Sequence, residues 1–266
     1  MRFKGKYDNI VEKNNSILCV GLDSDYERLP ECLKNEKNPM IKFNEEIINA
    51  TKDLVCSYKP NAAFYESAGR IGFEAWQKLN DQIDEKIPVI ADVKRGDIGN
   101  TARHYAKAIF ENNKFDASTN NPYMGWDAIK PFVEYESKYL FVLAITSNDS
   151  ASDFEYHDNL YLKVAKKVHE WNKNSKNMIG LVTGATKPEE LKDIREICSE
   201  EILLIPGIGT QGGEVEKTLK YGFGGTNGNM IINVARSIIF ASSGKDFAEK
   251  AREKAKFYKN LFNENI

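Results

Sequence analysis

Short apolar runs alternate along the chain with longer amphipathic stretches. The apolar runs predict eight strands, at Ile17–Gly21, Val55–Lys59, Pro88–Asp92, Phe115–Thr119, Tyr139–Ile145, Met178–Val182, Ile202–Ile205 and Met230–Val234. Stretches between them have helical character, as at Ile41–Leu54, Phe73–Ile83, Thr101–Phe110 and Leu160–Trp171. A proline followed by two glutamates at residues 188–190 is typical of a first helical turn. Packing of helices on the sheet explains the tryptophans at least as well as ligand stacking does: Trp76, Trp126 and Trp171.

Eight strands, each followed by a helix over about 250 residues, match the count of a (β/α)8 barrel. We therefore predict an α/β fold, a single (β/α)8 TIM barrel that forms one catalytic domain over residues 1–266. No linker-like or low-complexity segment argues for a second domain. A doubly wound sheet is the alternative, because strand order cannot be read from the sequence.

Composition narrows the class of protein. The net charge of −2 gives no electrostatic reason to expect a nucleic acid or an anionic membrane as partner. The N-terminus lacks the apolar stretch of a signal peptide, and no apolar run approaches membrane-spanning length. The cysteines have no paired or metal-ligand spacing, which predicts reduced core thiols in a cytoplasmic protein: Cys19, Cys32, Cys56 and Cys198. The three histidines are too scattered to suggest a zinc site: His104, His157 and His169.

Polar residues gather at the carboxyl ends of the predicted strands. In a barrel, this is the end at which the chemistry lies. Seven of the eight strands lead into such residues, among them Asp23, Lys59, Asn61, Asp92, Lys94, Asn120, Ser147, Gln211 and Arg236. Any one of them could cap a loop, but a loop cap does not explain seven on one face.

The segment Asp92–Thr101 is the most informative of these strand ends. It follows the apolar run Ile87–Ala91, so we expect Asp92 and Lys94, two positions apart, to project to the same side. Asp97 lies beyond them in the loop that leads into a helix. Charges at the mouth of a buried strand cost desolvation and usually have a task, although a structural ion-pair network is the alternative.

Charged residues at two other strand ends bring this cluster close to electrical neutrality. With Asp23 and Lys59 added, the group holds three carboxylates and two ammoniums. Alternating signs let each charge be paired in a partly buried site.

A second group follows the last two strands, at Pro206–Gly213 and Asn233–Arg236. A glycine-rich turn that enters a helix offers backbone N–H groups to an anion, and strands seven and eight are where barrels commonly hold phosphate. Arg236 supplies a fork for two phosphate oxygens, and Gln211 can donate from its amide. The run Gly222–Gly228 precedes a strand rather than a helix, so we interpret it as an ordinary connection.

These residues together resemble a known family. The pattern Asp92-x-Lys94-x-x-Asp97-Ile98-x-x-Thr101 resembles the signature of the orotidine 5′-phosphate decarboxylases. Asp23, Lys59 and the two groups after strands seven and eight follow in the family's order, so the resemblance spans residues 17–240. The segments 121–127 and 146–148 resemble the longer bacterial and Plasmodium-like branch.

The resemblance implies an activity and a catalytic group. The family decarboxylates orotidine 5′-phosphate to uridine 5′-phosphate, the last step of UMP (pyrimidine) biosynthesis, with no metal or cofactor. By resemblance, Lys59, Asp92, Lys94 and Asp97 form a charged tetrad, and Asp97 comes from the partner subunit of a homodimer. Lys94 delivers the proton to C6, and Asp92 lies beside the substrate carboxylate.

The resemblance also implies how substrate is held. The ribose hydroxyls are expected to be bound by Asp23 and Lys59 together with Thr101 of the partner subunit. The pyrimidine is expected to contact Asn61 and Ser147. The phosphate is expected to be bound by Gln211, Arg236 and the backbone amide of Ala235. The motifs add two further substrate-binding residues, Ile98 and Pro206. Ala235 stands where the family often has glycine or serine, which a backbone contact tolerates. Asp149 stands where proline is common, which leaves the shape of that loop open.

Two other functions remain open. Sugar-phosphate lyases and aldolases on related barrels share Asp-x-Lys-x-x-Asp but add acidic ligands for magnesium, for which Asn61 and Glu66 are the available residues. A phosphate-binding barrel without chemistry would not need the tetrad.

Overall fold

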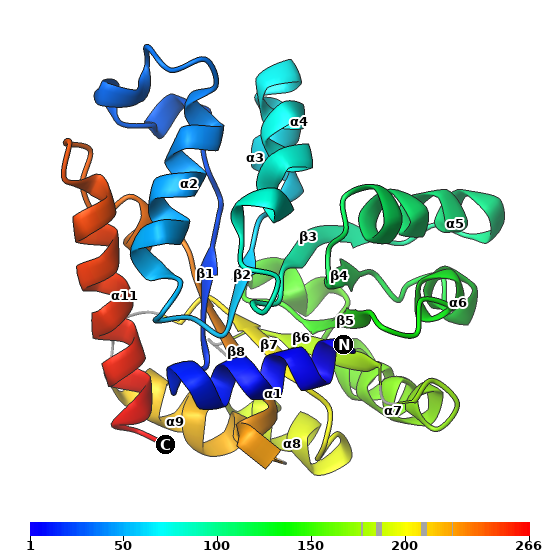
Figure 1. Cartoon of the computed structure of the whole chain (residues 1–266). Coiled ribbons are helices and arrows are strands. Elements are labelled where there is room, and N and C mark those ends of the chain that lie inside the picture. Colours follow the sequence, from blue (N-terminus) through cyan, green and yellow to red (C-terminus); the bar gives the residue numbers. More distant parts are fainter. Residues whose placement is uncertain (177, 185–187, 209–211, 225) are drawn as a thin grey trace.

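The computed structural model describes residues 1–176, 178–184, 188–208, 212–224 and 226–266. Its centre is a sheet of eight parallel strands, β1 (Leu18–Gly21), β2 (Ser57–Lys59), β3 (Ile90–Arg95), β4 (Ala117–Asn120), β5 (Tyr139–Ile145), β6 (Ile179–Thr183), β7 (Leu203–Pro206) and β8 (Met230–Val234). The strand order is β2-β1-β8-β7-β6-β5-β4-β3. The two edge strands meet through the bridges Tyr58↔Val89 and Asn61↔Asp92, which nearly close the barrel (Figure 1). The barrel prediction is confirmed, and the doubly wound alternative is wrong.

Helices surround the strands (Figure 1). They are α1 (Phe3–Asn14), α2 (Pro39–Thr51), α3 (Ala62–Ser67), α4 (Gly69–Lys78), α5 (Gly99–Lys107), α6 (Trp126–Val133), α7 (Leu160–Asn172), α8 (Pro188–Ile197), α9 (Gly212–Gly222), α10 (Arg236–Ile239) and α11 (Phe247–Asn263). The four predicted helical stretches and the helix start at Pro188 are confirmed within a few residues. None of the helices among the described residues is long and apolar enough to cross a membrane.

Helix α1, which the sequence pattern did not predict, lies across the end of the barrel where the strands begin (Figure 1). Its Phe3 and Tyr7 are buried, and the Tyr7 hydroxyl donates to the Met230 carbonyl at 2.9 Å. The Phe3 ring stacks on Tyr139, with 4.9 Å between the ring centroids. Because this end is covered by apolar packing, access to the barrel is left at the carboxyl ends of the strands.

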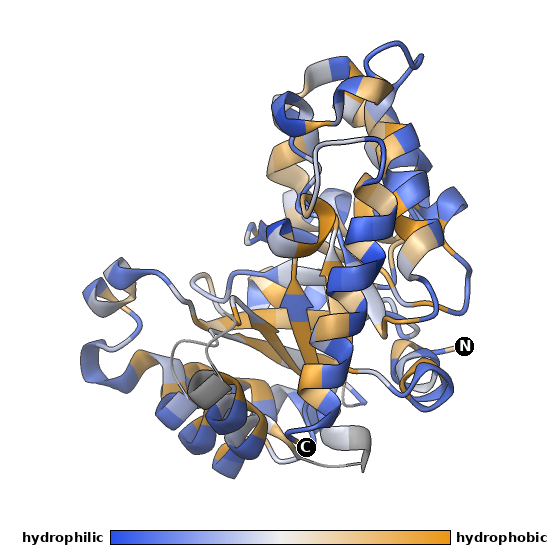
Figure 2. Cartoon of the chain, turned by 90° about the vertical axis from the view of Figure 1, so that its left-hand side faces the viewer, coloured by the Kyte–Doolittle hydropathy of each residue, from blue (hydrophilic) through white to orange (hydrophobic). Residues whose placement is uncertain are grey.

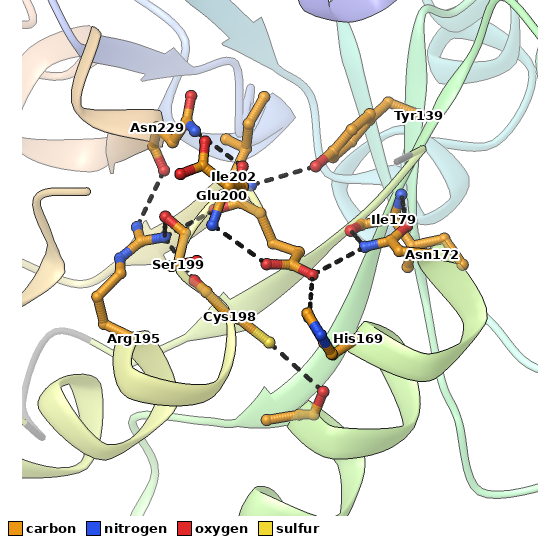
Figure 3. A network of polar contacts seen from close by, with 12 residues as sticks. Tyr139, His169, Asn172, Ile179, Arg195, Cys198, Ser199, Glu200, Ile202 and Asn229 are labelled. Atoms are coloured by element: carbon orange, nitrogen blue, oxygen red, sulfur yellow. Dashed lines mark hydrogen bonds and ion pairs between the residues drawn. The ribbon is translucent and has the colours of Figure 1, made fainter. Parts of the chain in front are cut away.

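A buried polar network ties the connections at this same end together (Figure 3). The Arg195 guanidinium donates to backbone carbonyls that precede β7 and β8, those of Cys198, Glu201, Gly222 and Asn229. The buried Glu201 carboxylate accepts from Asn172 and lies 3.1 Å from the His169 ring. Polar groups at this face of a barrel contribute to stability rather than to catalysis.

The core has the composition that the sequence pattern predicts. In Figure 2 the strands are mostly hydrophobic, and the helices carry hydrophilic residues on their outer surface. The tryptophans pack within the helical layer, with Trp126 and Trp171 in ring contact at 5.3 Å and Trp76 against Phe115 at 4.7 Å. All four cysteines are free. Three are buried, but Cys32 is exposed in a 3-10 turn, so the prediction of a core position is wrong for that residue.

Candidate active site

Two lysines and one aspartate form a chain of ion pairs at the open end of the barrel. The Lys59 Nζ, at the end of β2, lies 2.7 Å from Asp92 Oδ2. The Lys94 Nζ lies 2.5 Å from the other carboxylate oxygen, Oδ1. Lys59 and Asp92 are only 4% and 8% exposed, whereas the side chain of Lys94 is 48% exposed. The series of ion pairs therefore begins at the buried Lys59 and ends at the Lys94 ammonium, which solvent or a ligand can reach.

Burial and opposite charge compete in setting the pKa values of this group. Burial by itself would raise the pKa of Asp92, but the ammoniums of Lys59 and Lys94 outweigh it and lower that pKa well below its usual range. Burial would likewise lower the pKa of Lys59, but the carboxylates of Asp92 and Asp23 raise it above its usual value. The buried pair is therefore ionised at neutral pH.

The β3 strand does not run regularly through this site. Ala91 pairs with Ser118 and Arg95 with Asn120, so three residues of β3 lie opposite one residue of β4. Within this bulge, Lys94 has a φ of 45°, a left-handed conformation that costs a residue other than glycine about 1–3 kcal/mol. Asp92 and Lys94 do meet, as predicted. Regular strand alternation does not explain this contact, because the register of β3 is broken between Ala91 and Arg95, where both residues lie.

The residue opposite the bulge, Thr119, was not among the predicted site residues. Its Oγ1 accepts from the backbone N–H groups of Val93 at 3.0 Å and Lys94 at 2.9 Å. The same hydroxyl lies 3.0 Å from Asp92 Oδ1, to which it donates. The sequence signal was a run of polar residues, Ser118–Asn120, at the end of a buried strand. The register that selects Thr119 from this run comes only from the fold.

Asp23 links the ion-pair chain to a cavity of about 620 Å³. Burial raises the pKa of Asp23, and the nearby ammonium of Lys59 offsets only part of that. Its Oδ1 is buried without a hydrogen-bond partner among the described residues. The cavity wall also includes Ala235, Arg236 and Arg28. One aspartate and two arginines thus line the same space.

Strands β1 and β8 pack closely beside this cavity. A Cβ atom at Gly21 would lie 2.6 Å from the Ala235 Cβ and 3.1 Å from Asn233 Oδ1. Only glycine fits this close approach. Pro206 ends β7 and pairs with Asn233, so the ends of β7, β8 and β1 form one continuous wall.

The predicted pyrimidine contacts lie on two separate loops. Asn61 caps α3, its Oδ1 accepting from the Ala63 N–H at 3.1 Å, and its backbone bridges to Asp92. Ser147 is exposed after β5, and a Cβ at Gly207, which has a φ of 87°, would lie 3.6 Å from the Ser147 hydroxyl. Ser147 therefore lies over the loop that follows β7. The loop at Asp149, whose shape was open, forms a 3-10 helix over Asp149–Asp153.

Asp97 stands apart from the other members of the expected tetrad. Its carboxylate accepts from the Ile98 N–H at 2.8 Å, and within the described part of the chain it makes no ion pair with Lys59 or Lys94. Ile98 is 53% exposed, and Thr101 in the first turn of α5 is also exposed. One chain therefore brings together Asp23, Lys59, Asp92 and Lys94, but not these three. Gln211 lies outside the described residues.

No group of three or more His, Cys, Asp or Glu side chains is arranged as a metal site within the described ranges. The magnesium alternative depended on Asn61 and Glu66. The Glu66 carboxylate instead pairs with Arg95 at 3.1 Å, and the Asn61 carbonyl oxygen caps α3. Each of the two side chains is thus engaged in a contact away from Asp92.

Comparisons with known proteins identify the family of the chain. Residues 16–251 match the model of the orotidine 5′-phosphate decarboxylase / HUMPS family. An orotidine 5′-phosphate decarboxylase of Flavobacterium johnsoniae is 47% identical over 94% of this chain and 92% of its own. That of Christiangramia forsetii is 46% identical over 94% and 93%.

Solved structures give the same result. The OMP decarboxylase of Leishmania donovani superposes with a TM-score of 0.80 at 32% identity, covering 98% of this chain and 99% of that one. The orotidine 5′-monophosphate decarboxylase of Plasmodium berghei reaches 0.83 at 27% identity, covering 99% of each chain. With a family model matched over most of its length and relatives of this similarity, the chain belongs to the orotidine 5′-phosphate decarboxylase family and is a decarboxylase.

Proposed function

We propose that this chain converts orotidine 5′-phosphate to uridine 5′-phosphate without metal or cofactor, and that Lys94 protonates C6. The observation that carries the proposal is the chain of ion pairs from Lys59 through Asp92 to Lys94, at the open end of the barrel. It holds one partly exposed ammonium near a cavity whose wall includes Arg236 and Asp23, a residue with one oxygen unpaired among the described residues.

Each step of the reaction can then be assigned to a side chain of this protein. When the bond between C6 and the carboxyl carbon breaks, CO2 leaves and the electron pair stays on C6. The Lys94 ammonium stabilises that charge and then gives its proton to C6, which forms the new C–H bond. Asp92, next to the substrate carboxylate, would raise the energy of the bound substrate, and its ion pair keeps the Lys94 ammonium in place.

Binding energy from the phosphate supports the chemical step at a distance. Arg236 can bind two phosphate oxygens as a fork, and Gln211 and the Ala235 amide are the other proposed contacts. Asp23 and Lys59 hold the ribose hydroxyls. Asn61, Ser147, Ile98 and Pro206 contact the remainder of the substrate. Such remote contacts contribute to the transition state when they close the site.

We also propose that the active form is a homodimer with shared sites. Support comes from Asp97, which makes no ion pair with the described residues of its own chain, and from exposed Ile98 and Thr101 in the same segment. In the dimer, Asp97 would complete the tetrad of the partner's site and Thr101 would reach its ribose. The free thiols of Cys19, Cys32, Cys56 and Cys198 support a reducing compartment, the cytoplasm.

The experiment is the pair wild type and Lys94→Ala, assayed by the loss of orotidine 5′-phosphate absorbance with and without EDTA. The wild type should turn over substrate at the same rate with and without EDTA, since no step is assigned to a metal. Lys94→Ala should lose nearly all turnover yet still bind uridine 5′-phosphate, because the phosphate and ribose contacts lie on other strands. Turnover of Lys94→Ala within about tenfold of wild type, about 1.4 kcal/mol of barrier, would refute the assignment. Activity lost to EDTA and restored by magnesium would favour the lyase alternative.

A further inference from the structure

We propose that Thr119 on β4 is a positioning residue, whose hydroxyl holds Asp92 and Lys94 in their reactive arrangement and sets the rate of decarboxylation rather than the affinity for substrate. The inference rests on the function proposed above. It deepens that function by adding a buried side chain, only 2% exposed, that acts through Asp92 and Lys94.

The hydrogen bonds of this hydroxyl are fully determined. A threonine hydroxyl has one proton to donate and two lone pairs that accept. Both lone pairs are used by the N–H groups of Val93 and Lys94, at 3.0 and 2.9 Å. The only proton is then directed to Asp92 Oδ1, 3.0 Å away. A hydroxyl with this set of partners cannot rotate without losing a bond to a buried group.

The same contacts explain how the bulge persists. Where three residues of β3 face one residue of β4, the N–H groups of Val93 and Lys94 both donate to the Thr119 hydroxyl. A left-handed residue can turn successive N–H groups toward one acceptor, as in anion-binding backbone nests. Here the acceptor is the Thr119 oxygen. The hydroxyl thus replaces the strand ladder at the point where Lys94 adopts its φ of 45°.

The bulge in turn places the Lys94 ammonium. Asp92 Oδ1 receives both the Thr119 hydroxyl and the Lys94 ammonium, while Oδ2 receives Lys59. Thr119 therefore restrains the Lys94 backbone and its counter-ion at once. Without the hydroxyl, the bulge can relax toward a regular strand, which turns the Lys94 side chain away from its place. The substrate contacts on β1, β7 and β8 do not depend on this bulge.

Two variants separate the hydroxyl from the shape of the side chain. Thr119→Val keeps the shape and removes the hydroxyl, whereas Thr119→Ser keeps the hydroxyl. We expect Thr119→Val to lower kcat by at least about 30-fold, with KM and the Kd of uridine 5′-phosphate within about threefold of wild type. Thr119→Ser should return kcat to within about threefold of wild type. Should Thr119→Val fail to fold, Thr119→Ala replaces it, because it removes the same oxygen without placing a methyl group against the two N–H groups.

Thr51 offers a matched control. Its buried hydroxyl donates to the Ile47 carbonyl at 2.7 Å and lies 2.8 Å from the Tyr58 hydroxyl, on the last turn of α2. Thr51→Val makes the same chemical change in another buried site and should lower stability while kcat stays at the wild-type value. The inference is overturned if Thr119→Val keeps kcat within threefold, if Thr119→Ser is as slow as Thr119→Val, or if KM rises while kcat is kept.

Failure of the proposed function is visible separately, as absence of turnover in the wild type. In that event the positioning is measured without activity, by amide hydrogen exchange at Val93 and Lys94. Thr119→Val should speed exchange at these two amides by at least about tenfold, and Thr119→Ser should not. Unchanged exchange in Thr119→Val would overturn the inference whatever reaction the chain catalyses.

Discussion

The buried pair of Lys59 and Asp92 makes a quantitative prediction about stability. Asp92→Asn removes the charge that faces Lys59 at 2.7 Å, in a place where the lysine is 4% exposed. Among the described residues, Asp23 is then the remaining carboxylate that acts on the buried Lys59 ammonium. Removing one partner of a buried ion pair is costly because the other charge stays buried and unpaired.

The expected cost follows from this geometry. Breaking a buried pair typically costs about 3–5 kcal/mol, a large part of a folding free energy of about 5–15 kcal/mol. At roughly 2–4 °C per kcal/mol, Tm should fall by about 6–20 °C. The double variant Lys59→Met, Asp92→Asn has no buried ammonium at position 59 that lacks a counter-ion. It should therefore be more stable than Asp92→Asn alone, because replacing both charges of a buried pair is often neutral or stabilising.

The assay is urea unfolding of the wild type, both single variants and the double variant at pH 7 and a fixed protomer concentration. The slopes must agree for the midpoints to report stability. The four free energies form a double-mutant cycle, and its coupling term measures the pair directly. Additive effects, or an Asp92→Asn variant more stable than the wild type, would refute the reasoning. The second result would mean that repulsion between Asp92 and Asp23 outweighs the ion pair.

Four further outcomes are expected. Arg236→Ala should cost about 2–5 kcal/mol in kcat/KM for the phosphorylated substrate and almost nothing for the unphosphorylated nucleoside, and equal losses would place Arg236 away from the phosphate. Mixing inactive Lys94→Ala with inactive Asp97→Ala should restore activity in the heterodimer, whereas no recovery after proven subunit exchange would keep Asp97 in its own site. Arg195→Met should lower stability by about 1–3 kcal/mol in urea with kcat/KM unchanged, since among the described residues its guanidinium donates to backbone carbonyls at the opposite end of the barrel. Because the folded pKa of Asp92 lies below its unfolded value, its stabilisation is complete above about pH 4 and is lost as pH falls below that, so urea midpoints of wild type and Asp92→Asn should converge in acid.

Several features of the site could be predicted because they depend on local pattern. Strand bounds at Tyr139–Ile145 and Met230–Val234 agree with the structure residue for residue, since continuous apolar runs mark buried parallel strands. Charged residues directly after such runs must lie at the carboxyl ends of the strands. This placed Asp23, Lys59, Asp92 and Lys94 on one face before any contact was known.

Other features depend on pairs of residues far apart in the chain. The β3 bulge exists because residues 92–94 meet Thr119 on the neighbouring strand, and a propensity for strand says nothing about which residue will stand opposite. The left-handed backbone of Lys94 is unfavourable in isolation and persists only because tertiary hydrogen bonds hold it. Helix α1 was missed for a similar reason, since its Phe3 and Tyr7 are buried by contacts with β5 and β8.

By itself, the sequence determined the number of strands and the end of the barrel at which the candidate site lies, because hydrophobic periodicity and chain direction are local properties. The tertiary structure decided which charges touch. It joined Lys59 and Lys94 to opposite oxygens of Asp92, selected Thr119 from a run of polar residues, and left Asp97 apart from them. The physical reason is that ion pairs and hydrogen bonds act over about 3 Å, a precision that only strand register and barrel closure can supply.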